Sequence, residues 1–207
     1  AGEATAELYD PASETWTITG SLKTPCAFHS ALALANGQVL IAGCFSTFGP
    51  LGSAALYDAD SGTWTLAGSS DLARATPSMT LLPNGKVLVA GGQIYQTSNF
   101  SSNYYLFYEA TDVAQLYDPS TRKWTVTGPL NWPSAHHTAT LLPNGKVLVV
   151  GGDGGEDNDY GGIGRAQLYD PASGTWSSLD NNLTLPRVRH TATLLRNGKV
   201  LVVGGPP

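Results

Sequence analysis

One segment of the chain concentrates acidic side chains. Four carboxylates occur within seven residues, at Asp153, Glu156, Asp157 and Asp159. Carboxylate oxygens are ligands that Ca²⁺ prefers, so these side chains are candidate calcium ligands. Their spacing does not match a complete EF-hand loop, and Gly-rich acidic turns are often merely solvated. A calcium site and a solvated turn therefore remain as alternatives, and no other cofactor is expected.

A second segment, residues 93–112, is rich in aromatic side chains. Its candidate binding residues are Tyr95, Phe100, Tyr104, Tyr105, Phe107 and Tyr108. Trp132 lies in a nearby connection and joins this set. Tyr and Trp give a large contact area at modest entropic cost, which favours a platform for a sugar or a partner protein. The alternative is that the rings pack on one another or extend two strands outward.

Cationic side chains form a third candidate set, with the chemistry to attract an anionic group. The set consists of Arg74, His136, Arg187 and Arg189. The alternative is that the arginines are tied to neighbouring parts of the fold. His29, His137 and His190 each stand seven residues before an Asn-Gly pair. Because a catalytic residue is not expected to recur in this way, these three histidines are interpreted as makers of one repeated internal hydrogen bond.

The two cysteines, Cys26 and Cys44, permit one disulfide. In a simple hairpin register Cys44 faces His29, three residues away from Cys26. A bridge then needs the chain to bend before its first strand, so free thiols remain an alternative. Neither cysteine belongs to a zinc-binding pattern.

Composition and charge exclude several function classes. The formal net charge of −5 offers no basic patch for nucleic acid. The longest apolar runs are far shorter than the ~20 residues that a membrane span needs. No nucleophile elbow, phosphate-binding loop or HExxH motif occurs, which favours a protein without catalytic activity.

The elements that position these residues follow from an internal repeat. The triplet Leu-Tyr-Asp begins at Leu8, Leu56, Leu116 and Leu168, and a Trp follows eight residues after each Leu. About twenty residues beyond each Trp comes an Asn-Gly pair, followed by an apolar run that ends at a Gly pair or its variant. The steps between the Leu residues are 48, 60 and 52, and the extra length falls after the Gly pair. Insertions confined to one place in the repeat are typical of a binding face.

Each repeat predicts a four-stranded antiparallel meander. Asn-Gly between two apolar stretches is a strong hairpin signal, so residues 137–142 should pair with 146–150. Residues 166–169 and 175–177 should then form a third and a fourth strand. The second strand is apolar on both faces, which indicates a sheet packed between neighbouring sheets. Almost no helix is expected.

The Gly pair after the second strand, the Tyr of the third and the Trp of the fourth resemble the Kelch repeat. Residues 137–152 and 166–176 are similar to its bacterial form. The resemblance implies an all-β fold, a single β-propeller over residues 1–207 in which each repeat is one blade. The expected blades span residues 28–66, 78–126, 136–178, and 190–205 together with 4–18, so that the two termini share the closing blade. An open arc is the alternative.

The Kelch resemblance extends distantly to the central domain of galactose oxidase, which implies two enzyme alternatives. One is a copper oxidase, whose ligand set is not matched here because Pro77 stands where a Tyr would be needed. The other is a sugar mutarotase, for which Arg74, His136, Arg187, Arg189 and Glu156 are the groups available. Both are carbohydrate-active.

The leading functional prediction is a non-catalytic interaction module whose loop face binds a protein or a glycan. The alternatives are a structural propeller that self-associates and the enzymes named above. The triplets Asn99-Phe100-Ser101 and Asn182-Leu183-Thr184 match the N-glycosylation signal. They indicate a secreted, extracellular protein. Because of the acidic net charge and the short apolar runs, neither a nucleic-acid partner nor a membrane span is expected.

Overall fold

The computed structural model of the chain describes residues 3–100, 103–154 and 162–207, and for residues 96–100 and 103–107 it describes the backbone alone. All regular elements in this part of the chain are β-strands, which confirms the all-β prediction. Three of the sheets contain four antiparallel strands. None of the described elements is a helix that could cross a membrane.

The three complete blades each run from an inner to an outer strand. The first blade consists of β3 (Ser30–Ala33), β4 (Val39–Ala42), β7 (Ser53–Asp58) and β8 (Thr63–Ser69). The second consists of β9 (Ser78–Leu81), β10 (Val87–Ala90), β13 (Ala114–Asp118) and β14 (Lys123–Val126). The third consists of β15 (Thr138–Leu141), β16 (Val147–Val150), β17 (Ala166–Asp170) and β18 (Thr175–Ser178). The predicted hairpins and meander are confirmed in each blade.

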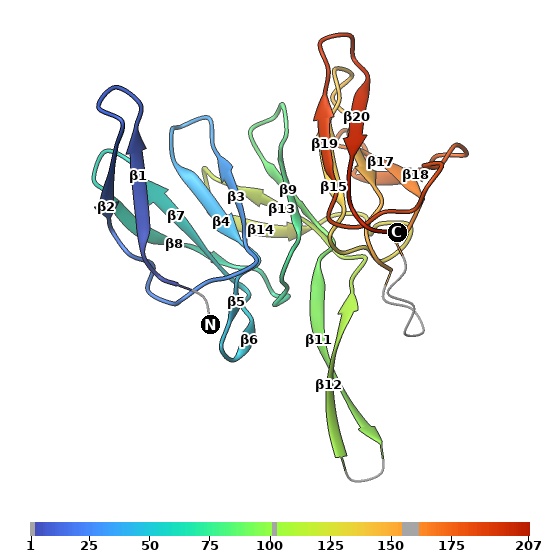
Figure 1. Cartoon of the computed structure of the whole chain (residues 1–207), viewed down its shortest axis with the longest axis horizontal. Helices are drawn as coiled ribbons and strands as arrows, with labels where there is room; N and C mark the ends of the chain where they lie inside the picture. The colour runs from blue at the N-terminus through green and yellow to red at the C-terminus, as the bar shows by residue number, and fades with distance from the viewer. Residues whose placement is uncertain (1–2, 101–102, 155–161) are drawn as a thin grey trace.

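Four two-stranded hairpins complete the fold. Two are half blades, formed by β1 (Ala6–Asp10) with β2 (Thr15–Thr19) and by β19 (Thr191–Leu194) with β20 (Val200–Val203). Two are insertions between the second and third strands of a blade, formed by β5 (Phe45–Ser46) with β6 (Gly49–Pro50) and by β11 (Gln93–Phe100) with β12 (Asn103–Ala110). The second insertion coincides with the aromatic segment, so its two strands project from the blade as a long hairpin (Figure 1).

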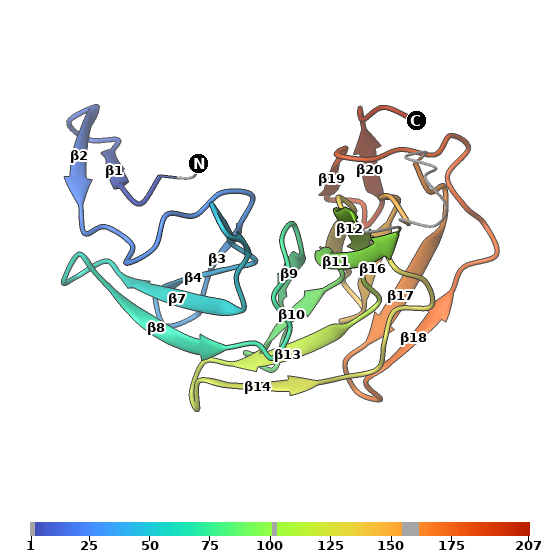
Figure 2. The same cartoon turned by 90° about the horizontal axis from the view of Figure 1, so that it is seen from below.

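The blades are arranged as an arc around a common axis (Figure 2). Their first strands lie innermost, and β3 contacts β9, β9 contacts β15, and β15 contacts β19. The arc is consistent with part of a β-propeller. The predicted closing blade is not formed, because β1–β2 and β19–β20 are separate sheets at opposite ends of the arc (Figures 1 and 2).

The core lies between adjacent blades, and β10 shows why the second strand of a blade must be apolar on both faces. Val87 and Val89 pack against the first blade, in a cluster with Leu40 and Leu56. The alternate residues of β10 pack against the third blade, in a cluster with Val147 and Tyr169. Side chains alternate across a strand, so a strand sandwiched between two sheets buries every residue.

The repeated Trp ties each blade to the one before it. Trp124 Nε1 donates to the Ala67 carbonyl of the first blade at 3.1 Å, and Trp176 Nε1 donates to the Gly128 carbonyl at 2.7 Å. Each Trp also packs on the Tyr of its own Leu-Tyr-Asp triplet, with ring centroids 5.0 Å apart for Tyr117 and Trp124. The motif therefore stabilises the contact between blades as well as the blade itself.

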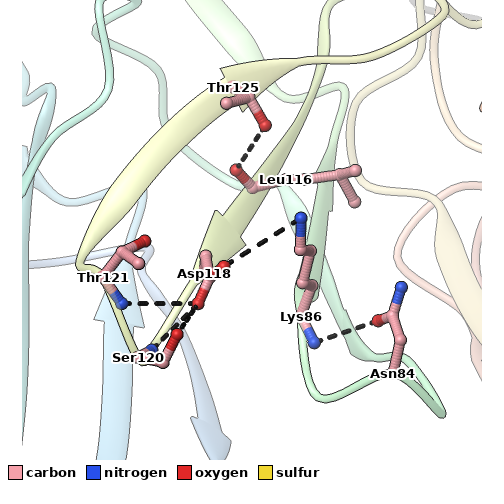
Figure 3. A network of polar contacts seen from close by, with 7 residues as sticks. All are labelled: Asn84, Lys86, Leu116, Asp118, Ser120, Thr121 and Thr125. Atoms are coloured by element: carbon pink, nitrogen blue, oxygen red, sulfur yellow. Dashed lines mark hydrogen bonds and ion pairs between the residues drawn. The ribbon is translucent and has the colours of Figure 1, made fainter.

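The Asp of the Leu-Tyr-Asp triplet organises the turn to the fourth strand. In the second blade, the Asp118 carboxylate accepts hydrogen bonds from the Ser120 amide at 2.9 Å and from the Ser120 hydroxyl at 2.6 Å (Figure 3). The Ser120 hydroxyl is the main cause that lowers the pKa of this carboxyl below its ordinary value of 3.8. Lys86 from the Asn-Gly hairpin lies 4.0 Å from Asp118, so the two turns of the blade are neighbours (Figure 3).

Candidate binding face

The two faces of the arc differ in their connections. The Asn-Gly turns and the turns after Leu-Tyr-Asp lie on one face, whereas the β5–β6 and β11–β12 hairpins extend from the opposite face (Figure 1). We call the second of these the loop face. The long connections between blades also reach it, because each blade has four antiparallel strands. The residues predicted to bind a partner lie on connections of this face.

Four aromatic rings on the loop face form a continuous row, the aromatic shelf, made of Phe28, Phe45, Tyr95 and Tyr108. The ring centroids lie 6.1 Å apart for Phe28 and Phe45 and 5.9 Å apart for Phe45 and Tyr95. Tyr95 and Tyr108 follow at 4.8 Å, and their hydroxyls are hydrogen-bonded at 2.9 Å. Phe28 is 69% exposed and Tyr108 is 47% exposed. The shelf therefore packs partly on itself and presents rings to solvent at both ends.

The aromatic shelf joins the first blade to the second. Tyr95 comes from β11 of the second blade, and it also packs beside Gly49 of β6, where an added β-carbon would meet the Tyr95 ring at 2.7 Å. Gly49 has φ 114°, a conformation that favours glycine. This close approach fixes the base of the long hairpin against the first blade. Next to it, Phe48 is 99% exposed at the tip of β5–β6.

The sequence predicted only part of this cluster. Tyr95 and Tyr108 were expected, but Phe28, Phe45 and Phe48 were missed. The signal that could have found them is their position: Phe45 and Phe48 follow the variant Gly43-Cys44 pair, where insertions begin in the other repeats. Phe100, Tyr104, Tyr105 and Phe107 are placed on β11 and β12, but their side chains lie outside the described residues.

Among the described residues, no aromatic contact links Trp132 to the shelf. It is half-buried, and the Arg165 guanidinium carbon lies 5.4 Å from its ring centroid, in a cation–π arrangement. Arg165 precedes β17, so this pair links two connections of the third blade on the loop face. Trp132 therefore remains a predicted binding residue, but one that is separate from the shelf.

Arg74, a candidate for binding an anion, follows the alternative in which the arginines are tied to neighbouring parts of the fold. Arg74 is buried, and its guanidinium donates to the Gly91 carbonyl at 3.2 Å, the Val113 carbonyl at 2.8 Å and the Gln115 side-chain oxygen. Burial lowers the pKa of Arg74 to about 10. The side chain satisfies carbonyl groups where the second blade meets its own insertion, so its role is structural.

Equivalent residues of the next repeats make the same contact. The Ser134 hydroxyl donates to the Gly151 carbonyl at 3.0 Å, and the Arg187 guanidinium donates to the Gly204 carbonyl at 2.8 Å. Arg187 therefore also follows the structural alternative. In the first repeat the equivalent residue is Cys26, which forms a disulfide with Cys44.

The disulfide shows that the free-thiol alternative is wrong. The chain bends at Phe28, which has φ 55°, and Ala27 pairs with Phe45. This brings the Cα atoms of Cys26 and Cys44 to 5.0 Å, although a regular ladder would keep them apart. Cys44 replaces the second glycine of the Gly pair. In the second repeat that glycine is Gly92, where an added β-carbon would meet the Ala75 carbonyl oxygen at 2.6 Å.

The interpretation of the recurrent histidines agrees with the structure for two of them. His137 Nε2 is hydrogen-bonded to the Ser78 hydroxyl at 2.8 Å, and His190 Nε2 to the Thr138 hydroxyl at 2.9 Å. In both cases the partner is the first residue of the inner strand of the preceding blade. His29, at the open end of the arc, is exposed.

The residues just before these positions adopt an unusual backbone conformation. Phe28, Thr76, His136 and Arg189 occupy equivalent places and have φ values of 55°, 53°, 54° and 53°. The left-handed region costs a non-glycine residue about 1 kcal/mol, because the β-carbon crowds the following carbonyl oxygen. All four line one depression of about 300 Å³ near the axis, which we call the axial depression. Two residues of the predicted cationic set, His136 and Arg189, are thus brought together.

His136 is held by the first residue of the acidic segment. Its Nδ1 lies 2.9 Å from the Asp153 carboxylate, and both side chains are mostly buried. Glu156, Asp157 and Asp159 lie outside the described residues. The calcium site remains a prediction; no cluster of three or more His, Cys, Asp or Glu suited to a metal occurs in residues 3–100, 103–154 and 162–207.

Comparison with known proteins supports the repeat assignment. No family model matches the chain. The chain is 29% identical to the Kelch-like protein terF of Aspergillus terreus (strain NIH 2624 / FGSC A1156) over 100 residues, which are 47% of this chain and 21% of that protein. This similarity supports Kelch repeats. The bacterial form of the repeat and the likeness to galactose oxidase remain predictions.

Proposed function

We propose that the chain is a non-catalytic binding module and that its loop face binds a protein or a glycan. The observation that carries the proposal is the aromatic shelf, in which Phe28 and Tyr108 stay exposed although they contact the half-buried Phe45 and Tyr95. Exposed rings on a rigid sheet scaffold give contact area with little loss of side-chain entropy on binding. The similarity to a Kelch-like protein is in keeping with a repeat that serves as a scaffold for binding loops.

The test uses the full chain on a printed glycan array and against a displayed random-peptide library. Tyr108→Ala and Phe48→Ala should weaken the strongest interaction about tenfold. The melting temperature of Phe48→Ala should stay within about 2 °C of the parent, because this side chain is 99% exposed. Tyr108→Ala should lower it by only a few degrees, because the ring is 47% exposed although it packs on Tyr95. Val126→Ala, which removes an exposed apolar side chain from the outer strand β14, is the matched control. Absence of any interaction on both formats would contradict the proposal, as would a loss of binding that accompanies unfolding.

The copper-oxidase alternative has no support from the site. Cys26 is the cysteine that would have to bond to a tyrosine ring, and its sulfur is already bonded to Cys44. Arg74 and Arg187, two of the groups available to a mutarotase, bind backbone carbonyls instead. No described arrangement favours either enzyme over the binding module.

A second candidate function is self-association through the open ends of the arc. Trp16 is 66% exposed and Val203 is 52% exposed, although their equivalents Trp124 and Val150 are covered by neighbouring blades. In the third blade Leu148 pairs with Leu168, which predicts pairing of the equivalent Leu201 with Leu8 of another copy. Unpaired edges of this kind are templates for further β-pairing. Light scattering should then give a mass above the monomer's 21.7 kDa that rises with concentration; a constant monomer mass contradicts it.

We propose an extracellular location as well. The Cys26–Cys44 disulfide supports it, since such bonds persist mainly in oxidising compartments.

A further inference from the structure

The four left-handed residues of the axial depression differ from the other repeated positions in their chemistry. Phe28, Thr76, His136 and Arg189 each stand eight residues before the Asn of an Asn-Gly turn. The residue before each of them is always small or apolar, namely Ala27, Ala75, Ala135 and Val188. At the left-handed position itself the four repeats carry a phenyl ring, a hydroxyl, an imidazole and a guanidinium. One position of the repeat is therefore chemically varied in all four copies, while the residue before it is always small or apolar.

If the left-handed position served only the fold, different residue types would be expected there. Glycine or asparagine adopts a left-handed conformation most readily, yet neither is present at any of the four places. Where the fold needs one contact, as at Arg74, Ser134 and Arg187, different side chains bind the equivalent glycine carbonyl in three of the four repeats. The left-handed side chains make no such common contact. Their varied chemistry, retained in spite of backbone strain, indicates recognition of a ligand.

The geometry collects these side chains at one place. The four residues line the axial depression together with His29, His137 and His190, which directly precede the inner strands. The Arg189 amide donates to the His136 carbonyl at 3.0 Å, and the Thr76 amide donates to the Phe28 carbonyl at 3.1 Å. These links between blades join the four positions in two pairs, Phe28 with Thr76 and His136 with Arg189. Each half of the depression is therefore held together by the backbone before any ligand arrives.

The groups that face the depression are complementary to a particular ligand. The exposed Arg189 supplies a cation. His136 keeps its Nε2 available, because Asp153 engages Nδ1. Phe28 presents an exposed ring at the border and continues into the aromatic shelf through Phe45. A carboxylate, several hydroxyls and an apolar ring face would satisfy all of these groups.

We propose that the axial depression binds an acidic saccharide, a chain containing uronic acid units. The carboxylate pairs with Arg189, a sugar hydroxyl bonds to His136, and a neighbouring sugar ring stacks on Phe28. The proposal rests on the proposed function, because it assigns a ligand class to the same loop face.

An acidic peptide fits these observations less well. Peptides commonly bind an open strand edge through their main chain. Here the amides of Thr76 and Arg189 are already bonded to neighbouring blades, so recognition depends on side chains. Directional side-chain donors beside an aromatic ring suit a ring of hydroxyls better than an extended main chain.

The experiment measures binding of the full chain to uronic-acid trisaccharides by calorimetry, with carboxyl-reduced trisaccharides for comparison. The uronic acids should bind at least about tenfold more tightly than their reduced forms, since a charged pair is lost on reduction. Arg189→Gly should abolish that preference, and Phe28→Gly should weaken both series. Neither variant should lower the melting temperature, because glycine relieves the left-handed backbone.

Arg122→Gly is the matched control. Arg122 is also an exposed arginine with φ 55°, but it lies in the turn after Leu-Tyr-Asp on the opposite face. This variant removes the same side chain and the same strain, and it should leave binding unchanged.

Several outcomes would overturn the inference. Equal binding of acidic and reduced sugars, an unchanged preference in Arg189→Gly, or binding only of acidic peptides would each do so. In these cases binding at the loop face, and with it the proposed function, would still stand. Absence of binding to sugars, peptides and arrays alike would overturn both.

Discussion

His137 of the third blade and Ser78 of the second are hydrogen-bonded at 2.8 Å across the boundary between their blades. His190 repeats the contact with Thr138 at the next boundary. Burial lowers the pKa of His137 from 6.5 to about 4, and burial is also the main cause that lowers the pKa of His190. Both side chains are therefore neutral in the folded protein near pH 7 and act as parts of the blade contact.

Stability should fall in mildly acidic solution. The unfolded chain binds protons at His137 more readily than the folded chain does, so the stabilisation is complete above about pH 6.5 and is lost as the pH falls toward 4. The expected slope is about 1 kcal/mol per pH unit for His137. Denaturant unfolding between pH 4 and pH 8 measures it.

The variant His137→Gln should flatten this pH dependence, whereas His29→Gln, at an exposed position, should leave it intact. The carboxylates of Asp58 and Asp170 have a pKa lowered below 3.8 by hydrogen bonds, from Ser61 and Lys146 respectively, so their contribution is lost only in more acidic solution. A stability that is constant from pH 4 to pH 8 would contradict the assignment.

Reduction of the disulfide should destabilise the chain. Cys26 and Cys44 are 18 residues apart, and a bridge over a loop of this size contributes about 3 kcal/mol, chiefly by restricting the unfolded chain. Melting with and without a reductant measures the effect, and the Cys26→Ala/Cys44→Ala double variant should show no response to the reductant. Two titratable thiols in the unreduced, unfolded protein would rule the bridge out.

Replacement of the repeated Trp should lower the free energy of unfolding only where the Trp contacts a preceding blade. Trp124→Phe removes the hydrogen bond to the Ala67 carbonyl and should cost about 1 to 2 kcal/mol in the free energy of unfolding. The same change at Trp16, which is 66% exposed, should cost less than about 0.5 kcal/mol. Equal losses at both positions would show that the Trp acts within its own blade.

Arg74→Met should be among the most destabilising single changes. It leaves the carbonyls of Gly91 and Val113 without their buried donor, at a cost of about 3 kcal/mol. Arg187→Met, at a more exposed equivalent position, should cost about 1 kcal/mol or less. If Arg74→Met were as stable as the parent and changed only the binding of an anion, the structural role of Arg74 would be refuted.

Local features of the fold could be predicted from the sequence because they depend on neighbours in the chain. The Asn-Gly pairs specify two-residue hairpins, and alternation or continuity of apolar residues specifies which strands are covered. Tyr95 and Tyr108 were found in the same way, as aromatic residues within an insertion. The repeat even indicated that His137 and His190 serve one internal hydrogen bond, since a recurring residue meets a recurring neighbour.

The sequence by itself determined the repeat, the strands, the turns and the face on which the insertions gather, because each depends on residues a few positions apart. Only the tertiary structure decided that Arg74 is buried, that Cys26 meets Cys44, that Phe28 and Phe45 extend the row of tyrosines, and that the two half blades stay apart. These contacts depend on the left-handed bend before each inner strand and on the angle between packed blades. Neither feature can be recognised from the residue types, since the bent position is occupied by Phe, Thr, His and Arg in the four repeats.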